Sequence, residues 1–348
     1  MKEQMMPIIL NENLERVAQV DDYISFIWTS RFYSPGDFEL CCNLSYTEYI
    51  YKGVYIARLN DDHLGIVEKI QYKLTEDQQE MLIASGRFLP SILARRVISA
   101  QTQLTGRVTT AMSTLITQNA INPSIAARKI TKLYFVNNSS NTDDLDVQYI
   151  GENLLETLSS LCELYKIGMD CVMDSNKNFK FTLYDGTDRS INQSIVPPAI
   201  FSQSYENLLN SEYDADYSDY ATDILVGGEG EGINRTMVWS AKQSQSNLAR
   251  YEKFLDASSA VSNEQIITQE TYIKQLQGLG LEEVTEYTTA FTGEIDFSNV
   301  VFGQDIFLGD ICTINNEHWG MTLDVRLLEI IESVGEDGTY TVVPTFGE

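Results

Sequence analysis

The sequence predicts a mainly β protein with α+β parts, in which two small antiparallel β-barrels accompany a mixed α/β helical region. Three observations predict this class. Apolar and polar residues alternate near the start of the chain, and they alternate again in its C-terminal segment, as in half-buried antiparallel strands. Between these stretches, apolar residues recur at the spacing of a helix.

A length of 348 residues is too great for one ordinary core and predicts two or three domains. We expect a first β-barrel over residues 1–98 and a mixed α/β domain over residues 99–198. The second β-barrel is expected to be discontinuous, over residues 199–244 and 291–348. A helical insertion over residues 245–290 interrupts it and is expected to pack on the mixed domain.

The first barrel begins with a predicted hairpin. Its turn lies at Tyr33–Asp37, where Pro35 fixes φ and Gly36 relaxes it. The strands on either side are expected over residues 23–28 and 38–44. Two further strands, over residues 49–59 and 64–74, flank the polar sequence 60–63.

The mixed domain begins where the apolar spacing becomes helical. Apolar residues over 88–98 predict one helix, and a second helix over 108–120 should end before Pro123. Asn153 is a candidate cap for a third helix with a broad apolar face. Two strands are expected to follow, over residues 168–173 and 179–184.

After the mixed domain, the sequence predicts strands, then a helical insertion, then further strands. A strand over 223–228 precedes helical spacing over 272–287, and the final strands begin near Phe291. Alternating segments at 307–314 and 321–331 flank the polar loop Asn315–His318, which predicts a hairpin.

The formal net charge of −26 and the pI near 4.3 argue against nucleic-acid binding, because DNA affinity comes largely from Lys and Arg that neutralise phosphates. The charge has two interpretations. It either keeps the protein soluble, or it lines a passage through which DNA moves without adhering. Between Glu206 and Glu231 the chain has no Lys or Arg and eight acidic residues, which are Glu206, Glu212, Asp214, Asp216, Asp219, Asp223, Glu229 and Glu231.

Two patterns resemble ligand loops. Asp174, Asn176, Asn178 and Asp185 stand at positions 1, 3, 5 and 12 of a calcium-loop register, but Phe179 takes the place of the required glycine, so a polar hairpin turn is favoured. Four glycines resemble a phosphate loop only loosely, since acidic residues separate them and no Gly-Lys-Ser/Thr follows. These glycines are Gly227, Gly228, Gly230 and Gly232.

No catalytic, cofactor or metal residues are predicted. With only His63 and His318, each in a predicted turn, a His-rich metal site cannot be built, and no G-x-S-x-G elbow is present. A pair of carboxylates in a glycosidase arrangement remains open. The five cysteines form no C-x-x-C pair and are expected to be reduced packing residues. They are Cys41, Cys42, Cys162, Cys171 and Cys312.

Three parts of the sequence carry a family resemblance. They are Phe26–Leu40, Ala84–Arg96, and Leu308–Cys312 together with Val325–Ile330. In this order they resemble the baseplate-hub proteins of phage tails, in particular the siphovirus tail-tip hub family, whose members also form the N-terminal part of tail-associated lysins. The second part is the most specific of the three.

The resemblance implies a structural, non-enzymatic virion protein without a cofactor. It implies a homotrimer in which two tail-tube-like barrels per subunit give a pseudo-sixfold ring, joining the sixfold tail tube to the threefold tip and lining the DNA channel. The implied partners are a tail tube or distal tail protein, a tape measure protein and a tip fibre or spike protein, with DNA only in passage. The chain ends after its last predicted strand, so no lysin domain is expected.

Two other functions remain open. One is a tail enzyme that degrades the cell wall, either a carboxylate-based hydrolase or a peptidase. The other is a receptor-binding module in which Tyr213, Tyr217 and Tyr220 stack on sugars. For a hub, we expect Ser30–Asp37 and Asn315–His318 to lie at contacts with other subunits or with the tube. Neither a signal peptide nor an apolar run of about 18 residues is present, so we expect synthesis in the host bacterial cytoplasm and a place at the virion tail tip.

Overall fold

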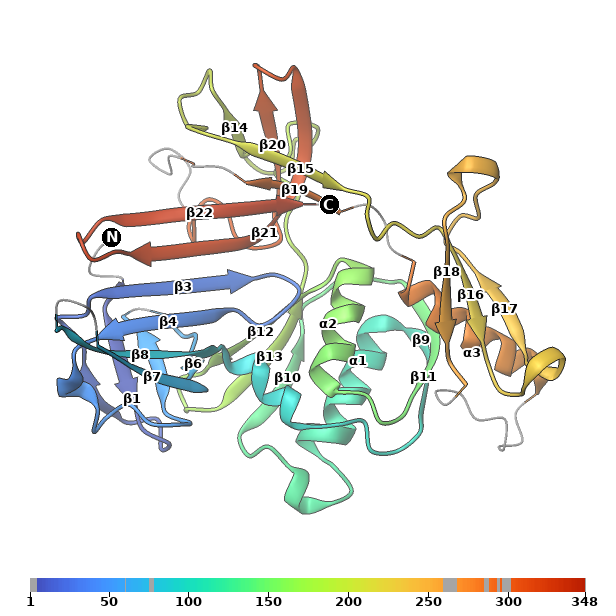
Figure 1. Cartoon of the computed structure of the whole chain (residues 1–348), viewed down its shortest axis with the longest axis horizontal. Helices are drawn as coiled ribbons and strands as arrows, with labels where there is room; N and C mark the ends of the chain where they lie inside the picture. The colour runs from blue at the N-terminus through green and yellow to red at the C-terminus, as the bar shows by residue number, and fades with distance from the viewer. Residues whose placement is uncertain are drawn as a thin grey trace.

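The computed structural model describes residues 5–59, 61–74, 78–258, 268–284, 288–292, 295 and 302–347 (Figure 1). The described chain is mainly β, with several sheets and few helices, which confirms the mainly β part of the predicted class but not its two barrels. Some predictions concern residues outside the described range. They are the expected absence of a signal peptide at residues 1–4, Asn60 in the polar sequence 60–63, and residues 259–267 and 285–287 of the helical insertion.

The N-terminal β unit encloses one core between two groups of strands. Phe26, Trp28 and Phe38 on one group pack with Ile9 and Ile56 on the other. The first group comprises β3 (Ser25–Arg31), β4 (Asp37–Cys42), β7 (Lys69–Leu74) and β8 (Glu80–Arg87). The second comprises β1 (Pro7–Leu10), β2 (Arg16–Gln19), β5 (Tyr55–Arg58) and β6 (Gly65–Ile66), and a 3-10 turn follows β4 at Leu44–Tyr46.

The C-terminal β unit has its own core, to which Phe201, Phe291, Leu327 and Phe346 contribute. Its hairpin β20–β21 turns at the predicted polar loop, because Asn316 pairs with Met321. The unit comprises β14 (Ile200–Ser202), β15 (Glu212–Asp216), β19 (Thr288–Thr292), β20 (Ile311–Asn316), β21 (Met321–Val334) and β22 (Tyr340–Gly347).

The two units share one sheet. β3 pairs antiparallel with β21, so the path β15-β19-β22-β21-β3-β4-β8-β7 runs from one unit into the other (Figure 1). Off this path, β20 pairs with β21 and β14 pairs with β20. Among the described strands, no sheet closes into a barrel. The reason is the β3–β21 pairing, through which the strands of both units continue as one open sheet instead of closing separately.

The mixed α/β region confirms the helix predicted after Asn153. The Asn153 side chain accepts hydrogen bonds from the backbone N–H groups of Leu155 and Glu156, which begins α2 (Leu154–Tyr165). α1 (Val108–Ile116) continues into a π turn (Thr117–Ile121). The strands are β9 (Thr102–Arg107), β10 (Leu133–Asn137), β11 (Asp144–Tyr149), β12 (Gly168–Met173) and β13 (Phe179–Tyr184), with a 3-10 turn at Ala126–Arg128.

The helix predicted over 88–98 is shorter than expected. It is a 3-10 helix over Leu89–Arg95 that begins with Pro90 in its first turn. Arg96 is already extended, and Ile98 donates its N–H to the carbonyl of Glu152. A 3-10 helix rarely runs longer than this, and the pairing of residues 97–98 with the start of α2 holds the following chain extended.

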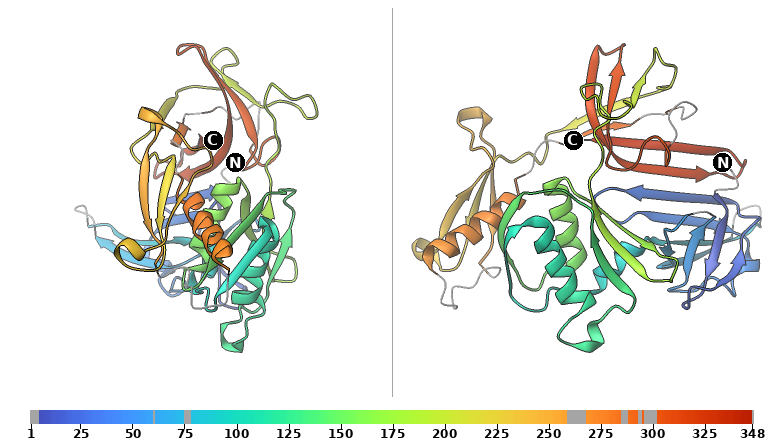
Figure 2. Two further views of the ribbon diagram at one scale, coloured as in Figure 1. Left: turned by 90° about the vertical axis from the view of Figure 1, so that its right-hand side faces the viewer. Right: turned by 180° about the vertical axis from the view of Figure 1, so that it is seen from behind.

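A small accessory sheet lies apart from the ten-stranded one (Figure 2). It contains β16 (Asp223–Gly227), β17 (Met237–Ser240) and β18 (Glu252–Asp256), with 3-10 turns at Gly232–Asn234 and Asn247–Ala249. α3 (Gln269–Glu282) packs on one face of this sheet and also contacts β11 of the mixed region.

Candidate assembly site at the junction of the two β units

Phe32 holds the junction together. Its side chain is fully buried, and its backbone N–H donates to the carbonyl of Leu328 at 2.9 Å while its carbonyl accepts from Met169 at 3.0 Å. Gly168 and Gly309 face the ring so closely that a Cβ on either would lie 2.2 Å from a ring carbon. Phe32 therefore connects the N-terminal unit, the mixed region and the C-terminal unit.

A network of ion pairs crosses the same junction. Arg31 of β3 donates from Nε to Glu329 of β21 at 2.6 Å and also pairs with Asp37. Arg58 of β5 pairs with Glu332 of β21 and with Asp61, and its guanidinium lies 5.4 Å from the centre of the Trp28 ring. Because these groups are half-buried or buried, removal of one partner would leave an uncompensated charge.

His63 extends this network to the mixed region. Its Nδ1 atom lies 2.5 Å from Asp61 Oδ1 and its Nε2 atom lies 3.2 Å from Asp170 Oδ2 on β12. Burial alone would lower the pKa of His63, but the carboxylates of Asp170 and Asp61 raise this pKa well above its usual range. The ring bridges two carboxylates, and both favour its charged form.

A cavity of about 460 Å³ lies beside this network, between the N-terminal unit, β12 and the segment 302–308. The acidic, basic and imidazole side chains in its described wall all have ionic partners: Arg31, Arg58, Asp61, His63, Asp170 and Glu332. Both imidazole nitrogens face carboxylates, so neither is left to activate a serine in the manner of a triad. The geometry is that of a structural joint.

The calcium-loop residues are not brought together. Asp174 accepts hydrogen bonds from the N–H groups of Asn176 and Asn178 and closes the β12–β13 turn. Asp185 lies beyond the opposite end of β13, where it accepts from Ser139 and Ser140. The predicted polar hairpin turn is confirmed. No group of three or more His, Cys, Asp or Glu within the described residues could hold a metal ion.

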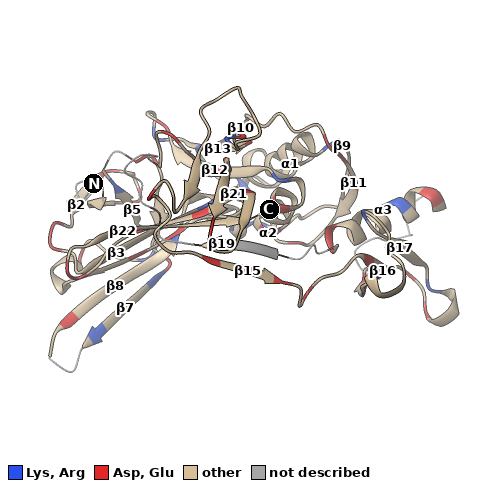
Figure 3. Cartoon of the chain, turned by 90° about the horizontal axis from the view of Figure 1, so that it is seen from above, with Lys and Arg blue, Asp and Glu red and all other residues tan. Residues whose placement is uncertain are grey.

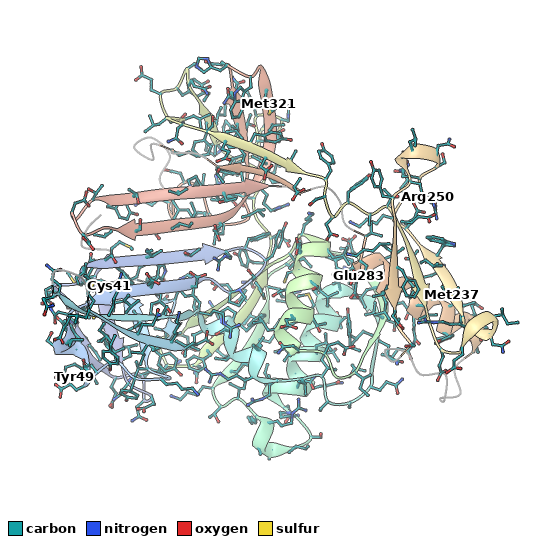
Figure 4. All side chains as sticks on the ribbon, viewed as in Figure 1. Cys41, Tyr49, Met237, Arg250, Glu283 and Met321 are labelled. Atoms are coloured by element: carbon teal, nitrogen blue, oxygen red, sulfur yellow. The ribbon has the colours of Figure 1, made fainter. Side chains whose placement is uncertain are left out.

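The glycine loop is occupied by the protein's own side chains. Arg235 donates to the carbonyls of Gly227 and Gly228, and the Tyr272 hydroxyl accepts from the N–H of Glu229. The N–H of Glu229, a group that a phosphate loop would direct at its ligand, is therefore already hydrogen-bonded within the protein. The five cysteines are buried and free, Cys41 among the strands of the N-terminal unit (Figure 4), and burial raises the pKa of Cys42 and of Cys312 to about 12.

The two loops expected at contacts with other subunits, Ser30–Asp37 and Asn315–His318, differ in exposure. Phe32 in the middle of Ser30–Asp37 is internal and cannot itself touch another subunit, whereas Ser34 and Asp37 are partly exposed, so a contact at the rest of this loop stays a prediction. Asn316 is buried and donates to Ser211, whereas Glu317 and His318 are exposed at the tip of the β20–β21 hairpin. A contact at that tip remains a prediction.

The three tyrosines do not share an exposed platform. Tyr213 on β15 packs against the C-terminal core, Tyr220 packs edge-on against Tyr251 with ring centres 5.0 Å apart, and Tyr217 is exposed.

Within the acidic run, Glu212, Asp214 and Asp216 are exposed on β15, whereas Asp223 is buried and pairs with Arg250.

Sequence reasoning missed the network around His63. Its members lie far apart in the sequence: His63 and Asp170 are 107 positions apart, and Arg58 and Glu332 are 274 positions apart. Only the local sequence Asp61-Asp62-His63 gave a signal, since an Asp two residues before a His can cap its backbone N–H.

Comparison with known proteins decides the family. The sequence profile of the family described as "Siphovirus ReqiPepy6 Gp37-like protein" matches residues 7–348. The chain belongs to this family. The description of this family names a siphovirus protein, in agreement with the siphovirus family that the resemblance predicted. No curated protein sequence matches the chain.

Solved structures share the fold of this family member. The tail protein from Neisseria meningitidis MC58 superposes with a TM-score of 0.61 at 12% identity, covering 99% of this chain and 96% of that chain. The prophage MuSo2 43 kDa tail protein from Shewanella oneidensis gives 0.56 at 12%, covering 98% and 97%. The prophage tail protein gp18 from Listeria monocytogenes EGD-e gives 0.55 at 10%, covering 99% and 94%. None of the described helices has the length and apolar character needed to cross a membrane.

Proposed function

We propose that this family member is a trimeric hub at the tail tip, joining the sixfold tail tube to the threefold tip around the DNA channel. The pairing of β3 with β21 carries the proposal, because it places two β units side by side in one chain. Three such chains supply six units. A ring of six can face a sixfold tube while its accessory parts keep threefold symmetry.

Each unit is proposed to act as one tail-tube-like barrel segment, completed in the assembly. The separate cores of the N-terminal and C-terminal units support this division. In this scheme residues 1–98 form the first segment, and residues 291–348 with the part of 199–244 that precedes β16 supply the second, because β16 and β17 belong to the accessory sheet. Residues 99–198 and the insertion 245–290 brace the ring.

The polar face of the shared sheet is proposed to line the channel. In antiparallel sheets, directly paired residues point to the same face. Glu39 on β4 and Glu329 on β21 lie on the face opposite the aromatic core residues Trp28 and Phe38. Carboxylates there would repel phosphates and let the genome pass without adhering.

The proposed partners are the tail tube or distal tail protein above the ring, the tape measure protein within it, and a fibre or spike protein below. The proposed role is non-enzymatic. The contacts of both His63 ring nitrogens with Asp61 and Asp170 support this, since this histidine lies beside a cavity but holds the joint together.

The test is the solution mass of the purified chain by sedimentation equilibrium, with negative-stain images of the same sample. A trimer with a central hole supports the hub. A monomer at every concentration, combined with hydrolysis of peptidoglycan that a single Asp or Glu substitution abolishes, would overturn it in favour of a tail enzyme.

A further inference from the structure

The ten-stranded sheet has two open ends. Among the described residues, β7 pairs only with β8, and β15 pairs only with β19. Each end strand therefore presents a row of backbone N–H and C=O groups without a strand partner within the described chain. Such edges are templates for pairing with another strand.

The two end strands carry opposite charge. β7 exposes Lys69 and Lys73, whereas β15 exposes Glu212, Asp214 and Asp216 (Figure 3). The basic strand stands out in a chain with 24 Lys and Arg against 50 Asp and Glu. Opposite charges on facing strands stabilise a pair, and like charges destabilise it.

Strand registers show that these charges lie on one face of the sheet. The pairings Glu212–Thr292, Thr292–Thr345, Thr345–Glu329 and Glu329–Arg31 carry the acidic side of β15 to β3. Arg31 and Ile27 share a face of β3 because they are four residues apart. The pairings Ile27–Glu39, Glu39–Ser85 and Ser85–Lys69 then reach the basic side of β7.

On the opposite face of the sheet, both end strands carry apolar side chains. Tyr213 and Ala215 on β15 share the face of the buried core residues Phe291 and Phe346. Ile70, Tyr72 and Leu74 on β7 share the face of the buried residues Leu82 and Ala84. Tyr72 and Leu74 are nevertheless 62% and 60% exposed, so the core face of this end strand is incompletely covered.

The directions of β7 and β15 also allow the two strands to pair. All seven successive pairings along the path from β15 to β7 are antiparallel, so β15 and β7 run in opposite directions within the sheet. A rotational repeat of the chain keeps both the faces and the directions of its strands. The β7 strand of one copy would therefore meet the β15 strand of the next as an antiparallel pair.

We propose that β7 of one copy pairs with β15 of the next copy and continues the sheet head to tail. A register centred on Gln71 opposite Asp214 places Lys73 opposite Glu212 and Lys69 opposite Asp216, with Tyr72 beside Tyr213. This inference rests on the proposed function, because such a heterologous contact yields a closed ring when the rotation between copies closes.

Charge reversal tests the pairing. Lys69→Glu with Lys73→Glu should abolish the trimer at concentrations where the unchanged chain is trimeric, and so should the triple change Glu212→Lys, Asp214→Lys and Asp216→Lys. All five changes in one chain should restore the trimer. Lys52→Glu with Lys129→Glu is the matched control, because it changes the net charge equally at exposed positions outside both strands and should leave the trimer intact.

A cysteine pair tests the register. Gln71→Cys with Asp214→Cys should give covalent trimers under mild oxidation, while Gln71→Cys with Tyr213→Cys, which points to the other face, should not. The native cysteines are buried.

The outcomes separate the two proposals. A trimer that survives reversal of the β7 charges and forms no disulfide overturns the strand pairing alone, and would mean that the lysines guard an edge against pairing. A chain that remains monomeric at every concentration and forms no intermolecular disulfide overturns both.

Discussion

The Nε2 atom of His63 lies 3.2 Å from the Oδ2 atom of Asp170, and this contact joins the loop after β5 to β12 of the mixed region. The pKa of His63 is raised in the folded chain, so the bridge stabilises the fold fully below the unfolded pKa near 6.5, and this stabilisation is lost as pH rises through the folded pKa. We expect the thermal midpoint to fall across that window, as measured by calorimetry.

The variant His63→Gln should lower the free energy of unfolding at pH 6 by about 1–3 kcal/mol, because it leaves Asp61 and Asp170 without the imidazolium. The loss should shrink at a pH above the folded pKa. His318→Gln at the exposed hairpin tip is the control. An equal loss at both pH values would contradict the charge argument.

Glu282 should be a destabilising charge. Burial raises its pKa to about 7, and Glu283 and Glu152 add to the effect, although the hydrogen bond from Tyr149 opposes it. The folded chain holds a proton that the unfolded chain releases above about pH 4.5, so stability should fall between pH 4.5 and 7. Glu282→Gln should therefore raise the free energy of unfolding by about 1–3 kcal/mol at pH 8 and flatten this dependence. Glu270→Gln, at the exposed start of α3, should leave the slope unchanged when urea unfolding is followed across pH.

Gly168 cannot accept a side chain beside Phe32. A Cβ there would lie 2.2 Å from the ring, so Gly168→Ala should destabilise the chain by about 1–3 kcal/mol. Adding Phe32→Leu should recover part of that loss, because the smaller side chain makes room. Gly335→Ala, with its nearest contact at 3.3 Å, serves as the control in urea unfolding. A strictly additive double variant would rule out the contact as the cause.

A basic residue on the proposed channel face should make the assembly bind DNA. Glu39→Lys changes an exposed side chain of β4 on that face, and we expect salt-dependent binding of duplex DNA by fluorescence anisotropy. Glu156→Lys on the exposed side of α2 gives the same charge change elsewhere. Equal DNA binding by both variants would argue against a channel lined by this face.

Local features were predictable because they follow from the chain's own geometry. The period-two segments became β20 and β21, and the strands expected over 168–173 and 179–184 have those bounds in the structure. Asn153 caps its helix as predicted, since a cap needs only neighbouring backbone N–H groups. The helix predicted over 88–98 is a shorter 3-10 helix, because the pairing of Val97 and Ile98 with the start of α2 outweighed the apolar spacing.

The sequence by itself determined the strand and helix types, the acidic character and the kinship with phage tail proteins, because periodicity, charge and family motifs are properties of neighbouring residues. Only the tertiary structure decided that β3 pairs with β21, that His63 bridges Asp61 and Asp170, and that the ends of one sheet carry opposite charges on the same face. Within the β3–β21 pairing, Arg31 and Glu329 are 298 positions apart in the sequence. Alternation shows that a strand has a buried face, but the packing of whole units selects its partner.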